Sequence, residues 1–183
     1  MIYIIVGNSG SGKSTLAYDL QKSGFNRIIT YTTRPMRMGE INGKDYVFIS
    51  KSEFLKKYDN NEFIGPTKYA GNFYGTLKSD LIEAEKNPTP AVIIVDINGI
   101  KKIKEQFPKS VCIYLYASDE VLEKRMKKRN DEKALIEKRL DEVYDYSKIC
   151  DYSIDAKKGE EEVLKEVLEI IKKKNYNRNC SKW

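Results

Sequence analysis

Short apolar runs alternate with amphipathic segments along most of this 183-residue chain. The apolar runs predict buried strands over residues 1–6, 27–31, 91–96, 110–116 and 151–155. Helical spacing of apolar residues predicts helices over residues 13–21, 98–106, 118–129, 132–149 and 159–174. Alternation of this kind is typical of an α/β fold, so we expect a mainly parallel, five-stranded core sheet flanked by helices.

The stretch between the second and third expected strands, residues 32–90, is too long and too patterned for a linker. It contains a strand-like run at 45–49, a helical pattern at 50–58, a glycine- and aromatic-rich stretch at 69–75 and a second helical pattern at 76–86. We interpret it as an inserted lobe. Residues 175–183 are polar and lack apolar periodicity, so we expect a frayed tail there.

Residues 7–14 read Gly-Asn-Ser-Gly-Ser-Gly-Lys-Ser and match the pattern of a phosphate-binding loop. A strand is expected before this loop and a helix after it, so the helix N-terminus and main-chain N–H groups would face the phosphates. We expect Lys13 to reach the β- and γ-phosphates and the Ser14 hydroxyl to bind Mg²⁺. The other residues expected to hold the nucleoside triphosphate are Gly7, Asn8, Ser9, Gly10, Ser11, Gly12 and Thr15.

Composition narrows the class of protein. Lysine and arginine number 33 against 27 acidic residues, giving a net charge of +6 that favours capture of nucleotides without requiring a nucleic-acid partner. Histidine is absent, which excludes histidine acid–base catalysis and histidine-containing zinc sites. The three cysteines, at 112, 150 and 180, form no CxxC pair, so we expect them to be reduced in a cytoplasmic protein. No apolar run suggests a membrane partner.

Three further motifs follow the phosphate-binding loop: Thr-Thr-Arg-Pro-Met-Arg-Met-Gly-Glu at 32–40, Asn-Gly-Lys-Asp-Tyr at 42–46 and Gly-Asn-Phe-Tyr-Gly-Thr at 71–76. In this order and spacing, the chain resembles guanylate kinases from residue 1 to about residue 156. The resemblance implies Mg²⁺-dependent transfer of the γ-phosphoryl group of ATP to a nucleoside monophosphate. It also implies one domain over 1–183, with a core (1–31, 91–125 and 140–175), a monophosphate-binding lobe (32–90), a helical lid (about 126–139) and a tail (176–183).

Two arginines and two tyrosines of these motifs suit a phosphate group. Arg34 and Arg37 each offer a planar guanidinium fork that pairs with two phosphate oxygens. Tyr46 and Tyr74 offer phenolic hydroxyls. The resemblance assigns all four to the phosphate of the monophosphate.

Other charged residues suit the transfer step, which needs positioning and positive charge more than covalent chemistry. Arg125, Arg129 and Arg139 match the lid arginines of the family, and with Lys13 and Arg34 they form the expected catalytic set. Asp96 ends an apolar run where enzymes with this loop place a carboxylate near Mg²⁺. We expect Asp96 and Ser14 to serve the metal.

The resemblance fails at the end of the acceptor site that reads guanine. The family places a glutamate where this chain has Gly65, and a second acid where it has Asn98. Thr30 and Thr76 keep hydroxyls expected near the base, and we also expect Asp96 and Asn98 to contact the substrate. Two interpretations stay open: the acceptor is GMP or dGMP, read by main-chain carbonyls, water or another side chain, or it carries another base. A non-catalytic protein-binding module is less favoured because Gly12-Lys-Ser14 is complete.

Overall fold

The computed structural model describes residues 1–69 and 71–180, with the side chains of residues 175–180 left out. Its main sheet has five strands, and all four neighbouring pairs are parallel. The strand order is β2 (Asn26–Arg27), β7 (Ala91–Ile94), β1 (Ile2–Val6), β8 (Val111–Tyr116) and β9 (Tyr152–Asp155). The expected α/β fold with a five-stranded core sheet is confirmed.

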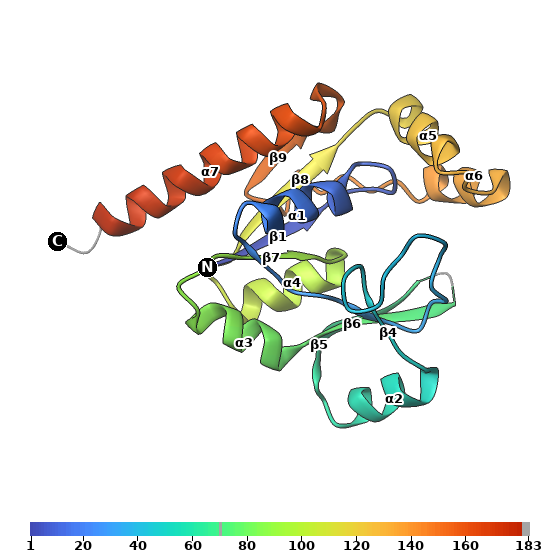
Figure 1. Cartoon of the computed structure of the whole chain (residues 1–183), viewed down its shortest axis with the longest axis horizontal. Helices are drawn as coiled ribbons and strands as arrows, with labels where there is room; N and C mark the ends of the chain where they lie inside the picture. The colour runs from blue at the N-terminus through green and yellow to red at the C-terminus, as the bar shows by residue number, and fades with distance from the viewer. Residues whose placement is uncertain (70, 181–183) are drawn as a thin grey trace.

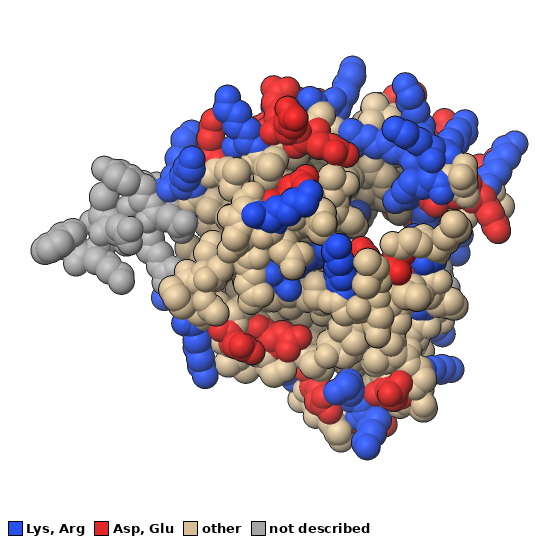
Figure 2. Space-filling model, viewed as in Figure 1, with Lys and Arg blue, Asp and Glu red and all other residues tan. Residues whose placement is uncertain are grey.

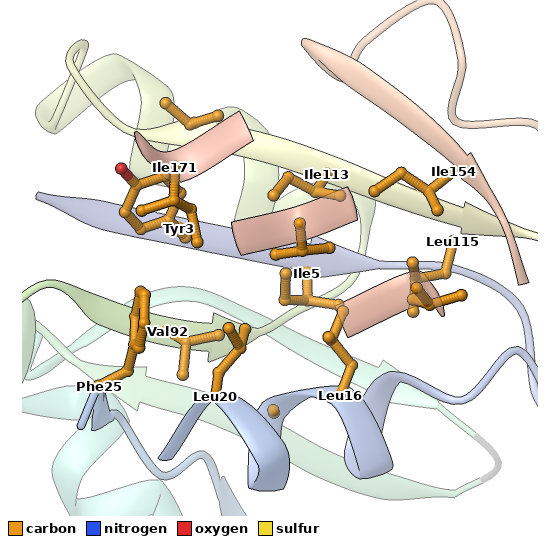
Figure 3. Close-up of a cluster of buried hydrophobic side chains, with 14 of the residues drawn as sticks. Tyr3, Ile5, Leu16, Leu20, Phe25, Val92, Ile113, Leu115, Ile154 and Ile171 are labelled. Carbon is orange, nitrogen blue, oxygen red and sulfur yellow. The ribbon is translucent and has the colours of Figure 1, made fainter. Parts of the chain in front are cut away.

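Helices cover both faces of this sheet (Figure 1). One face packs on α1 (Lys13–Lys22) and α7 (Glu160–Cys180), and the other on α3 (Lys78–Lys86) and α4 (Ile97–Gln106). Every residue of β1 is buried, as expected for a central parallel strand. Tyr3 and Ile5 point toward Leu16 and Leu20 of α1 and Ile171 of α7 (Figure 3). The core thus holds β1 rigidly behind the phosphate-binding loop.

A second sheet of four strands lies below the main sheet in Figure 1. Its order is β4 (Val47–Phe48), β3 (Tyr31–Thr32), β6 (Asn72–Leu77) and β5 (Phe63–Tyr69). Helix α2 (Lys51–Asp59) packs against it through Phe54, whose ring stacks on Phe63 and Phe73 at centroid distances of 4.4 and 5.4 Å. Apart from Tyr31, this sheet is built from the segment that the sequence pattern set apart as residues 32–90.

Two short helices follow β8: α5 (Asp119–Lys128) and α6 (Lys133–Asp141). They pack on each other through Leu122, Met126 and Ile136. A 3-10 turn, η1 (Ala156–Lys158), joins β9 to α7. In the part of the chain that the model describes, no helix has the length and apolar character needed to span a membrane.

The structure corrects three of the expected elements. The strand expected over 27–31 is two strands: Asn26 and Arg27 pair with β7, whereas Tyr31 pairs with β6 of the second sheet. The helix expected over 132–149 ends at Asp141. The tail expected from residue 175 is helical as far as Cys180, and residues 181–183 lie outside the described part.

The expectation of three reduced cysteines is also wrong. Cys112 and Cys150 form a disulfide, with their Cα atoms 4.7 Å apart. The sequence separation of 38 residues hides this pairing. It arises because β9 pairs with β8, and the N–H of Asp151 donates to the carbonyl oxygen of Cys112. The two cysteines are therefore neighbours across adjacent chain segments.

Candidate active site

The loop of residues 7–12 joins β1 to α1 and borders a cleft of about 1280 Å³. Every residue from Gly7 to Thr15 lines this cleft. Gly10 has φ +86°, and a Cβ atom there would lie 2.9 Å from the carbonyl oxygen of Leu122 in α5. Only glycine suits both the left-handed conformation and this close approach. The loop thus packs on α5 and presents the N-terminus of α1 to the cleft, a favourable setting for an anion.

Lys13 is half-buried at the start of α1, and its Nζ donates to the main-chain oxygen of Asn8 at 2.9 Å. Burial, reinforced by the charges of Arg129 and Arg139, lowers the pKa of Lys13 from 10.5 to about 8. Desolvation and neighbouring cations both disfavour the ammonium form. A bound phosphate would offset both effects, so this position strongly favours an anionic ligand.

Two of the arginines expected in the lid enter the same cleft. The guanidinium groups of Arg129 and Arg139 both bind Asp131, at 2.8 and 2.6 Å. The Arg139 side chain is 8% exposed, and its Nε has no hydrogen-bond partner among the described residues. A buried donor without a partner is a group that an anionic ligand can satisfy. Figure 2 shows lysine and arginine side chains gathered over α5 and α6, beside a hollow in the surface.

Arg125 has a different environment. Its guanidinium donates to the main-chain oxygens of Gly10 and Ala156, at 3.3 and 2.7 Å. These contacts tie α5 to the phosphate-binding loop and to the segment after β9. Arg125 lines the cleft, but its donors already serve main-chain carbonyls.

The four residues expected to hold the acceptor phosphate come together on the lobe side of the cleft. Arg34 donates to Glu40 at 2.6 Å, and its guanidinium carbon lies 5.4 Å from the ring centre of Tyr46. The ring centres of Tyr46 and Tyr74 are 6.1 Å apart. Burial opposes the charge on Arg34, but its hydrogen bond to Glu40 raises the pKa of the guanidinium overall.

Arg37 links Arg34 electrostatically with Arg139 of α6. Burial lowers the pKa of Arg37, and the nearby charges of Arg34 and Arg139 lower it further. Since Arg139 also acts on Lys13, one run of cations extends from the phosphate-binding loop to the lobe. Two phosphate-bearing ligands could meet along this run.

Ser14 and Asp96 both line the cleft, as the expected metal site requires. The Asp96 carboxylate also caps α4 by accepting the N–H of Gly99 at 2.9 Å. Among the described residues, no group of three or more His, Cys, Asp or Glu side chains could hold a metal ion unaided. A hydroxyl and a carboxylate are oxygen ligands of the kind that Mg²⁺ accepts together with nucleotide phosphates. The pair therefore fits a Mg²⁺ ion that arrives with a nucleotide.

The residues expected near the base separate in the structure. Thr30 and Thr76 line the cleft, and the Thr30 hydroxyl donates to the main-chain oxygen of Ile94 at 3.2 Å. Gly65 lines the cleft as well. Asn98 is exposed in the first turn of α4 and is not among the cleft-lining residues, so the structure does not bring it into the site.

Sequence reasoning missed several participants. Asp131, which holds two lid arginines, had no motif to mark it. Tyr146 lines the cleft, where burial, with the Asp96 charge nearby, raises its pKa to about 12. The Asn8 side chain exchanges two hydrogen bonds of 3.0 Å with the main chain of Tyr144. The two tyrosines were expected in a helix, which concealed their loop and its contact with the phosphate-binding loop.

Comparison with known proteins agrees with this geometry. A model of the guanylate kinase family matches residues 1–174. The chain belongs to the guanylate kinase family. It is 33% identical over 156 residues to the guanylate kinase of Carboxydothermus hydrogenoformans, covering 83% of this chain and 76% of that one. It is 38% identical over 142 residues to the guanylate kinase of Fusobacterium nucleatum, covering 76% and 77% respectively.

A solved structure supports the same assignment. The guanylate kinase from Anaplasma phagocytophilum superimposes with a TM-score of 0.71 at 28% identity, covering 94% of this chain and 84% of that one. Membership of the guanylate kinase family makes this chain a phosphotransferase of the nucleoside monophosphate kinase class.

Proposed function

We propose that this enzyme transfers the γ-phosphoryl group of ATP to GMP, dGMP or a related nucleoside monophosphate, with Mg²⁺. The observation that carries the proposal is the run of cations in one cleft, from Lys13 through Arg139 and Arg37 to Arg34. Such an arrangement suits two phosphate groups brought together end to end. A nucleotide hydrolase binds no acceptor phosphate and so would not need Arg34 and Arg37 at the far end of this run.

In the proposed reaction, a phosphate oxygen of the monophosphate attacks the γ-phosphorus of ATP. A new P–O bond forms, the bond to the β–γ bridging oxygen breaks, and ADP leaves with that oxygen. Lys13 and the main chain of the loop hold the β- and γ-phosphates, while Arg34, Arg37, Tyr46 and Tyr74 hold and orient the acceptor phosphate. Mg²⁺, held through Ser14 and Asp96, would neutralise phosphate charge.

We assign the segments to the roles expected from the sequence: residues 32–90 as the monophosphate-binding lobe and about 126–139 as the lid, on a core formed by the rest of one domain. Arg129 and Arg139 then reach the transferring group when the lid lies over both nucleotides. Arg125 acts with them by fixing α5 to the phosphate-binding loop. A closed lid excludes water and so limits hydrolysis of ATP.

A kinase for a monophosphate with another base is the second candidate, because Gly65 stands where the family reads guanine with a carboxylate. Measuring ADP formation against all ribo- and deoxynucleoside monophosphates, with ATP and Mg²⁺, decides between the candidates. The proposal expects turnover with GMP or dGMP. Turnover confined to non-guanine acceptors would favour the second candidate, and no turnover with any acceptor would refute a kinase function.

A further inference from the structure

The direction of the acceptor site follows from strand β6. Tyr74 and Thr76 are two positions apart on this strand, and both line the cleft. Side chains two apart on a strand share a face and lie about 6–7 Å from each other. A monophosphate whose phosphate lies at Tyr74, Arg34 and Arg37 therefore extends its base toward Thr76. The other cleft-lining residues at this end are Ile64, Gly65, Gly75, Val95 and Gly99.

Beside Thr76, part of the cleft wall is main chain. Gly65 follows Ile64, the pairing partner of Thr76, and has φ +51°. A Cβ atom at Gly65 would lie 2.9 Å from the Cα of Gly99 and 3.1 Å from the carbonyl oxygen of Asn98. These are rigid atoms of the first turn of α4. An acidic side chain at position 65 would need α4 to move away from β5.

The carboxylates that line the cleft are occupied elsewhere. Among the described residues they are Asp19, Glu40, Asp45, Asp96, Asp131, Glu142 and Glu160. Glu40 and Asp131 pair with arginines of the phosphate region, and Asp45 accepts the N–H of Ile41. Asp96 caps α4. Asp19 and Glu160 belong to α1 and α7 on the donor side, and Glu142 follows the lid helix α6.

Two further carboxylates lie close in sequence to the base end, but neither lines the cleft. Glu62 accepts from Lys57 at 2.9 Å and from Asn60 at 3.2 Å, next to helix α2. Asp80 accepts from the hydroxyl of Ser79 at 3.2 Å in the first turn of α3. The carboxylate that the described residues place beside the base end is that of Asp96, and it is committed to the Gly99 N–H and to the proposed Mg²⁺ site.

We infer that the acceptor site reads its base through the Thr76 hydroxyl and main-chain groups, and that it accepts hypoxanthine about as well as guanine. This inference rests on the proposed function. The two bases differ only by the 2-amino group of guanine. A site with a carboxylate for that donor rejects hypoxanthine strongly, since the carboxylate is then left unpaired. A site without the carboxylate incurs no such penalty.

Comparing kcat/KM for GMP and for IMP, with saturating ATP and Mg²⁺, tests the inference on the unmodified enzyme. We expect a GMP-to-IMP ratio below about 10, as for gain or loss of one hydrogen bond to an uncharged group. A ratio of about 10 or more overturns the inference while leaving the kinase function intact. No turnover with either acceptor overturns the inference together with the proposed function.

Three variants test which side chains contact the base. Thr76→Val keeps the shape of the side chain and should lower kcat/KM about fivefold for GMP and IMP alike, so the ratio stays constant. Glu62→Gln and Asp80→Asn remove the two carboxylates that lie close in sequence to this end without lining the cleft, and they should leave the ratio unchanged. If any of the three variants lowered kcat/KM for GMP but not for IMP, the replaced side chain would be a partner of the guanine 2-amino group. That result would overturn the inference.

Discussion

At the scale of single residues, the site is defined by cationic side chains whose charge is disfavoured by burial and by neighbouring cations. A bound phosphate would relieve both effects. Lys13 is the residue whose charge depends most on pH near neutrality, because its pKa is about 8. Arg37 is shifted in the same direction by its arginine neighbours. The motif spacing was enough to select these residues as candidates, and the structure places both of them in one cleft. Their electrostatic coupling was not visible, because it depends on which segments face each other across the cleft.

The shifted pKa of Lys13 predicts a pH dependence. Its protonated form binds the phosphates, so kcat/KM for ATP should be level below about pH 8 and fall about tenfold per unit above it. The fall in kcat should come at higher pH, because bound triphosphate stabilises the ammonium. In Lys13→Arg the guanidinium stays charged, so the alkaline fall should vanish from whatever activity remains. A level kcat/KM up to pH 9.5 in the unmodified enzyme would contradict this account.

Arg139 is predicted to act mainly in the transition state. Replacing it with lysine keeps a charge but loses the fixed pair of donors, so kcat should fall about 100-fold or more with KM for ATP changed less than about fivefold. Steady-state kinetics measure both constants. Lys133→Ala is the control on the same helix, since Lys133 is 89% exposed and should leave both unchanged. A kcat within fivefold of the unmodified enzyme would remove Arg139 from the catalytic set.

At the scale of elements, the strongly periodic helices, the central strands and β4 were predictable, whereas β5 and β6 of the second sheet were not. β5 and β6 escaped prediction because Gly65, Pro66 and Gly71 interrupt the alternation of apolar and polar residues. The register of the pair shifts between Ile64 and Thr67. The loop after α6 was predicted to be part of a helix over 132–149, yet its packing is decided by contacts of Tyr144 with Asn8 and Tyr114.

Helix α2 provides a prediction about stability. Ser50 and Glu53 form a capping box, in which the Ser50 hydroxyl accepts the Glu53 N–H at 3.2 Å and Glu53 accepts the Ser50 N–H at 2.8 Å. Ser50→Ala should lower the free energy of unfolding by about 1 kcal/mol, measured by urea denaturation. Lys51→Ala, at the exposed first residue of α2, should change it by less than about 0.5 kcal/mol. If the two substitutions changed the free energy of unfolding equally, the capping box would make no specific contribution to stability.

At the scale of the whole molecule, the Cys112–Cys150 disulfide closes a loop that contains both α5 and α6. Without reductant, the denatured protein should therefore show one reactive thiol, that of Cys180, and three after reduction. Reduction should lower the free energy of unfolding by about 2–4 kcal/mol, because the unfolded chain gains freedom. Three thiols titrated without reductant would contradict the disulfide.

The central claim is that one cleft joins a triphosphate donor to a monophosphate acceptor. The most direct measurement is to incubate the enzyme with ATP labelled in the γ-phosphate, Mg²⁺ and GMP, and to separate the products. We expect the label in GDP, little in inorganic phosphate, and no transfer by Lys13→Met, whose fold should be intact. Label released only as inorganic phosphate, or label in GDP with Lys13→Met, would contradict the account.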